Sequence, residues 1–144
     1  MFRYKKILLM DAYFKTKKYE IYRDKTIYEF VGIKVYKKFL PTTGDIIRKW
    51  RNIVQIRLDR SKRISELYRY ERQTKIYEIR HIIGAIVFVV LIFVIDKKLN
   101  LIEIVFLTFL NIYVNIYPII LQRHNRIRVI KVLLKNGEQS SYEK

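Results

Sequence analysis

Two long apolar segments constrain the fold of this chain more than any other feature of its sequence. The first, residues 82–95, has 14 residues and no charge, and the second, residues 99–121, has 23 residues and one charge, Glu103. About 20 apolar residues are needed to cross the hydrocarbon core of a bilayer. With the apolar residues that precede residue 82, the segments predict two membrane-spanning helices, at about 78–96 and 99–121. The alternative for the first segment is a buried core element.

The short connection at residues 96–100 makes the two predicted spans a helical hairpin. Of the 30 lysines and arginines, 22 lie in residues 1–80, two in the connection and six in residues 122–144. Basic residues are retained on the cytoplasmic side of a membrane. We therefore expect a multi-pass protein of the cell membrane with both termini in the cytoplasm. The predicted fold class is an all-α integral membrane protein.

The expected organisation has three parts. A basic cytoplasmic or interfacial region, helical over residues 45–80, occupies residues 1–80; the hairpin occupies 81–122; and a basic tail occupies 123–144. An apolar run of only four residues, 7–10, follows the first basic residues. This run is too short for a signal peptide, so no secretion signal is expected.

A net charge of +17 implies a polyanionic partner, either nucleic acid or an anionic membrane surface. Because the basic residues bracket apolar segments, we expect membrane lipids as partners and no nucleic acid. The chain has no cysteine and two histidines. These residues do not predict a metal site, and no cofactor is expected.

The second apolar segment carries polar residues on one side. Thr108, Asn111 and Asn115 are spaced so that they share one helix face. Such a face usually points at a partner helix, within the hairpin or in a homodimer. The alternative is that Asn115 binds substrate. Pro118 is expected to bend the helix and to free a backbone carbonyl.

Glu78 and His81 are the candidate catalytic pair. A spacing of three places them on one helix face at the start of the first span. A carboxylate beside an imidazole orients the ring and raises its basicity, as a general base requires. The alternative is an ordinary surface pair.

A second polar cluster follows the second span, and the hairpin should bring it to the same membrane boundary. Three planar cations suit phosphate or carboxylate groups, and two amides suit a carbonyl or hydroxyl. The cluster consists of Gln122, Arg123, Asn125, Arg126 and Arg128. The alternative is that the arginines only determine topology.

Three blocks of the sequence resemble the glycosyl-4,4'-diaponeurosporenoate acyltransferases, a bacterial membrane family. They are Lys-Val-Tyr-Lys-Lys-Phe-Leu-Pro-Thr-Thr-Gly at 34–44, Gln-Thr-x-x-x-Glu-x-x-His at 73–81, and the 115–128 block with its Gln-Arg-His-Asn-Arg-Ile-Arg end. Gln73, His124 and Ile127 stand where the family has Glu, Tyr and Pro.

This resemblance implies transfer of a fatty acyl group onto a sugar hydroxyl of a glycosylated carotenoid. The expected reactants are an acyl donor and a glycolipid-like acceptor. Carried over by position, the matching residues are Glu78, His81, Asn115, Gln122, Arg123, Asn125, Arg126 and Arg128. In this hypothesis His81 is the base, the arginines hold an anionic group of the donor, and Gln122 or Asn125 polarises its carbonyl. The alternative is a non-enzymatic module that binds anionic lipid or a membrane partner.

Overall fold

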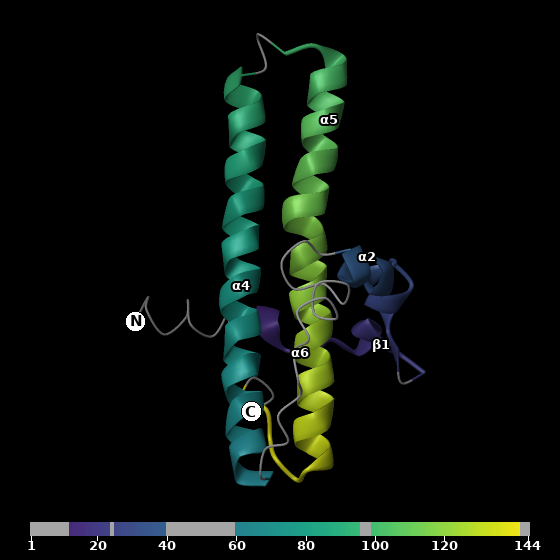
Figure 1. Cartoon of the computed structure of the whole chain (residues 1–144), viewed down its shortest axis with the longest axis vertical. Coiled ribbons are helices and arrows are strands. Elements are labelled where there is room, and N and C mark those ends of the chain that lie inside the picture. The colour runs from purple at the N-terminus through teal and green to yellow at the C-terminus, as the bar shows by residue number, and fades with distance from the viewer. Residues whose placement is uncertain (1–11, 24, 40–59, 96–98, 142–144) are drawn as a thin grey trace.

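The computed structural model describes residues 12–23, 25–39, 60–95 and 99–141. These residues are mostly helical and form a long antiparallel hairpin (Figure 1). One leg is a single helix, α4 (Arg60–Ile95). The other leg is continuous and consists of α5 (Leu101–Asn111), the π-helix η4 (Ile112–Ile116) and α6 (Tyr117–Lys135). The predicted helical hairpin is confirmed, as are two helices long and apolar enough to cross a membrane.

The hairpin is much longer than its apolar part. With 36 residues, α4 extends about 54 Å, whereas the hydrocarbon core of a bilayer is about 30 Å thick. Neither residue 80 nor residue 122, the expected boundaries of the hairpin, coincides with a helix end. The expected helix at 45–80 is described from Arg60 onward, and residues 45–59 lie outside the described residues. Below its apolar half, the hairpin therefore continues as a polar helical stalk.

A small N-terminal unit packs against the stalk, beside α6 (Figure 1). It was expected to contain amphipathic helical pieces, but it also contains a short β-hairpin with Ile21 paired to Thr26, which the all-α prediction missed. Its elements are η1 (Lys18–Glu20), β1 (Ile21–Tyr22), β2 (Lys25–Thr26), η2 (Ile27–Glu29) and α2 (Ile33–Phe39). Ile33 and Tyr36 of α2 form a small apolar core with Leu121 of α6.

The two halves of the hairpin distribute polarity in opposite ways. In the apolar half, large side chains face outward: Phe93 is 74% exposed and Ile102 is 81% exposed. In the stalk, α4 turns Glu71, Thr74 and Glu78 toward the interior, where all three are buried. A water-soluble protein rarely exposes an apolar surface of this extent. The outward apolar half is therefore the part of the molecule that could lie in a bilayer.

The π-helix explains how the second leg accommodates Pro118. The Tyr117 N–H bonds to the carbonyl of Ile112, five residues earlier. The Tyr113 carbonyl would then need the N–H of residue 118, which proline lacks. The hydroxyl of Tyr36 donates to this carbonyl at 3.1 Å instead. The carbonyl that Pro118 was expected to free thus anchors α2 to the hairpin.

The polar face of the second leg was expected to contact a partner helix. Two of its three residues, Asn111 and Asn115, do contact α4. Asn115 Nδ2 donates to Asn111 Oδ1 at 2.7 Å, and Asn111 Nδ2 donates to the Ala85 carbonyl of α4 at 3.4 Å. Gly84 of α4 approaches Asn115 closely. Thr108 does not take part: it is exposed and bonds to the Ile104 carbonyl of its own helix, because a hydroxyl can satisfy itself locally.

Candidate functional site

A buried ionic network lies where the N-terminal unit, α4 and α6 meet. Glu78 of α4 is fully buried, and Arg126 Nη1 donates to its Oε2 at 2.6 Å. Arg123 Nη1 lies 3.5 Å from its Oε1. Two polar clusters that are distant in the sequence therefore converge, as the hairpin predicted.

The network continues into the N-terminal unit through Glu20, which is also buried. Arg123 Nε donates to Glu20 Oε1 across 103 positions of sequence, and the Tyr28 hydroxyl donates to the same oxygen. The Lys17 N–H donates to Oε2 at 2.6 Å. Arg123 also donates to the Tyr13 carbonyl at 3.1 Å. Glu20 thus ties η1 to the middle of α6.

Two carboxylates neutralise two guanidinium groups in this network. Aromatic rings cover the cations: Arg123 lies 4.8 Å from the centre of the Tyr13 ring and Arg126 4.9 Å from that of Phe14. Removing one partner of such a buried pair typically costs about 3–5 kcal/mol, because the other charge is left uncompensated. The arrangement fits a clamp between the N-terminal unit and the stalk.

The surroundings of Glu20 keep it ionised. Burial alone would raise the pKa of this carboxyl, but the hydrogen bonds from Arg123, Tyr28 and the Lys17 amide outweigh burial and lower it. Burial and the adjacent Glu20 raise the pKa of the Tyr28 hydroxyl, so it remains a proton donor. Both effects stabilise a charged carboxylate in a buried position.

A separate buried carboxylate, Glu71, holds the chain after α6 against α4. The Ser140 hydroxyl donates to Glu71 Oε1, and the Ser141 N–H lies 3.4 Å from Oε2. The Tyr68 hydroxyl donates to the Gln139 carbonyl at 2.9 Å. No sequence pattern indicates this contact, because Glu71 is one of several charged residues along α4.

The expected pairing of Glu78 with His81 is absent from the described part of the chain. Both Glu78 oxygens contact arginines, so this carboxylate does not orient the imidazole. His81 is half-buried, and its ring forms no hydrogen bond with any residue that the structure describes. It lies one helical turn from Glu78, toward the apolar half.

The other histidine borders a cavity of about 340 Å³ between η2, α2 and α6. His124 is buried, and its Nδ1 lies 2.7 Å from the Thr26 hydroxyl. The cavity is lined by Glu29, Ile33, Lys34, Lys37, Leu121, His124 and Arg128. A second cavity of about 270 Å³ shares Lys37 and Arg128 with the first and is otherwise lined by Leu67, Tyr70, Asn125, Val129 and Val132.

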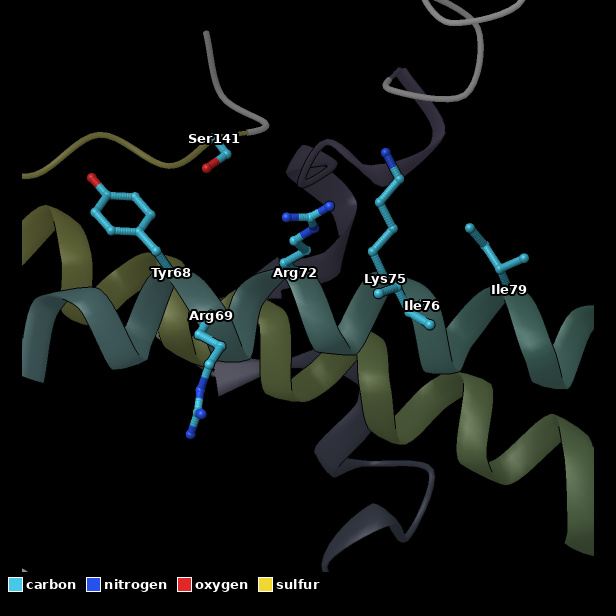
Figure 2. Close-up of a pocket in the computed structure, with 7 residues that line it drawn as sticks. All are labelled: Tyr68, Arg69, Arg72, Lys75, Ile76, Ile79 and Ser141. Carbon is cyan, nitrogen blue, oxygen red and sulfur yellow. The ribbon is translucent and has the colours of Figure 1, made fainter.

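A third and larger cavity, about 630 Å³, lies along the outer side of α4. Figure 2 shows Tyr68, Arg72 and Lys75 on the side of the helix where Ser141 lies, and Arg69 pointing away from it. Ile76 and Ile79 continue its wall toward the apolar half. None of the predicted site residues lines this cavity.

The predicted site residues therefore separate into groups. Glu78, Arg123 and Arg126 form the buried network. Asn125 and Arg128 line the cavities beside α2, Asn115 lies between the legs of the hairpin, and Gln122 is half-buried on α6.

Sequence reasoning missed Glu20, Lys34, Lys37 and His124. The spacing of the two lysines indicates one helix face, but only the folded chain brings that face against α6.

The family model described as glycosyl-4,4'-diaponeurosporenoate acyltransferase matches residues 10–135. The match includes the N-terminal unit, both legs of the hairpin and every residue of the ionic network. Searches of curated proteins and of solved structures give no match.

Proposed function

This chain belongs to the glycosyl-4,4'-diaponeurosporenoate acyltransferase family, and from that premise we propose that it transfers a fatty acyl group to a hydroxyl of a glycosylated carotenoid or a similar glycolipid. The family match supports acyl transfer in carotenoid synthesis. The identity of the acceptor within that class is our proposal. The family match over residues 10–135 is the single observation that carries this function, because it covers the whole described hairpin and the site beside it.

We propose that the apolar half of the hairpin lies in the cell membrane. Its outward-facing side chains, such as Phe93 and Ile102, would contact lipid tails, and the stalk would project into the cytoplasm with both termini. The ionic network and the cavities beside α2 would then lie near the headgroups. A lipid-like acceptor would reach this level by moving within the membrane.

We propose His81 as the base that takes the proton of the acceptor hydroxyl. Its ring has no hydrogen-bond partner among the described residues, so none of them occupies the ring nitrogen that would accept the proton. It also lies on the membrane side of the network. An amide, Gln122 or Asn125, would donate to the acyl oxygen as negative charge develops there.

The three arginines of α6 have different roles in this proposal. Arg123 and Arg126 already neutralise Glu20 and Glu78, so we assign them to holding the site together. Arg128 has no carboxylate partner among the described residues and remains suited to an anionic group of the donor.

A comparison of the two histidines tests the proposal. The purified protein, in detergent with a glycosylated carotenoid and a fatty acyl thioester, should form an acylated product. His81→Ala should lower turnover about 10²–10⁴-fold, the usual contribution of a general base. His124→Tyr, which places the family's residue at that position, should stay close to wild type. Unchanged turnover in His81→Ala would rule out His81 as the base. Loss of turnover in His124→Tyr but not in His81→Ala would indicate His124 instead.

A further inference from the structure

We infer that the cavity between η2, α2 and α6 binds a phosphate ester. This inference deepens the proposed function, because it rests in part on the anion-binding role proposed above for Arg128 and names the chemical class of the anion. The cavity gathers cations from two elements that are far apart in the sequence: Lys34 and Lys37 from α2, and Arg128 from α6. A spacing of three on α2 places both lysines on the same side of that helix.

The balance of charge in the cavity favours a divalent anion. The one carboxylate among the described residues that line it, Glu29, forms an ion pair with Lys34 at 2.5 Å. Neither Lys37 nor Arg128 has an ion pair or hydrogen bond to any residue that the structure describes. Two uncompensated cations match a phosphate monoester, which carries a charge of about −1.5 to −2 at neutral pH. The planar guanidinium of Arg128 also suits two phosphate oxygens at once.

The neighbouring arginines of α6 provide an internal contrast. Arg123 and Arg126 are buried and already paired with Glu20 and Glu78. Arg128 is exposed and is itself one of the residues that line the cavity. A free anion would have to displace a buried carboxylate to reach the first two, but it meets Arg128 directly.

The walls of the cavity indicate an apolar arm on the ligand. Ile33 and Leu121 line the cavity beside the cations. The adjoining cavity is also lined by Lys37 and Arg128, and its wall includes the apolar Val129 and Val132. A phosphate placed between Lys37 and Arg128 would therefore have apolar surface on both sides. The headgroup of phosphatidic acid and the 3′-phosphate of a water-soluble acyl-coenzyme A share this chemistry, since both are phosphate monoesters.

Binding of two probes to one pair of variants tests the inference. The full-length protein in phosphate-free maltoside micelles is titrated with dihexanoyl phosphatidic acid and, separately, with palmitoyl-coenzyme A. The cavity variant Lys37→Gln/Arg128→Gln is compared with Lys38→Gln/Lys135→Gln. The control removes the same charge from the same two helices, at exposed positions that do not line the cavity.

We expect the cavity variant to bind about tenfold or more weakly, since two charge-assisted bonds are lost. The control should stay within about twofold of wild type. A loss confined to phosphatidic acid identifies a headgroup, and a loss confined to palmitoyl-coenzyme A identifies a soluble carrier. Equal binding by the two variants, or no binding of either probe to wild type, overturns the inference.

The result is separable from folding and from catalysis. Lys37 and Arg128 are not in the core, so both double variants should have the same melting temperature as wild type. Arg128→Lys should bind more strongly than Arg128→Gln, because it restores the charge. Cavity-dependent binding without acyl transfer in wild type would refute the proposed function alone. Normal binding in an active Lys37→Gln/Arg128→Gln variant would refute the phosphate site and the donor role of Arg128, and it would leave the proposed acyl transfer standing.

Discussion

At the scale of single residues, the meaning of an arginine on α6 depends on its partner. Arg123 and Arg126 bond to the buried Glu20 and Glu78, whereas Arg128, two positions further, lines an open cavity. Their spacing in the sequence is similar, so the sequence alone did not separate a structural cation from a binding one. The separation comes from the two carboxylates that pack against α6: Glu20 of the N-terminal unit and Glu78 of α4.

This division predicts unequal effects on stability. Arg126→Gln removes the 2.6 Å ion pair of the buried Glu78 and leaves the longer contact to Arg123, so we expect the free energy of unfolding to fall by about 3–5 kcal/mol. Arg128→Gln, at an exposed position, should change it by less than about 0.5 kcal/mol. Equilibrium unfolding in detergent measures both. Equal effects would mean that the network is not a clamp.

The network also predicts a dependence of stability on pH. The folded protein lowers the pKa of Glu20 below its ordinary value of 4.5, so the unfolded chain binds the proton more readily. The stabilisation is therefore present above the ordinary pKa and is lost as the pH falls through the lower folded value. Glu20→Gln should remove part of this acid-induced loss, and the control variant Glu66→Gln, at a half-buried position outside the network, should not. Parallel acid-unfolding curves for wild type and Glu20→Gln would contradict the account.

At the scale of elements, the hairpin is held together by polar contacts and close approach. A Cβ added at Gly84 would lie 2.7 Å from Asn115 Oδ1. Asn115 cannot easily withdraw, because its Nδ2 bonds to Asn111 at 2.7 Å and it is buried. The glycine therefore sets how closely α4 approaches the π-helix.

We predict that Gly84→Ala costs about 1–3 kcal/mol of stability through overpacking. A second change, Asn115→Ala, should relieve the clash, so the double variant should be more stable than the sum of the single effects predicts. A double-mutant cycle of thermal unfolding in detergent measures this coupling. Additive effects would show that the two residues do not touch.

Much of the fold of the elements was predictable, and the reasons are local. Length and apolar content predicted the two long helices, and the polar spacing of Asn111 and Asn115 predicted their contact. Three features were not: the β-hairpin at Ile21–Thr26, the bond from Tyr36 to the π-helix, and the return of Ser140 to Glu71. The last two depend on contacts between distant segments, which a local pattern does not encode. The β-hairpin is local, but its strands have only two residues each and no glycine marks its turn.

At the scale of the whole molecule, the hairpin has an apolar half and a polar stalk, and the N-terminal unit packs on the stalk (Figure 1). The convergence of Glu78 with the 122–128 cluster followed from the hairpin alone. The pairing of Glu78 with His81 did not occur, because two arginines occupy both oxygens of the carboxylate. The candidate site thus combines a buried ionic network, which holds the N-terminal unit on the stalk, with Lys37 and Arg128 beside α2, which are unpaired among the described residues.

The most direct test of the central claim is mass spectrometry of lipids from cells that make a glycosylated carotenoid. The cells express wild type or His81→Ala at matched levels in the membrane fraction. The account predicts that only wild type converts the glycoside to a species heavier by one fatty acid less one water, the mass change of ester formation. Identical extracts from cells with wild type, with His81→Ala and without the protein would contradict it.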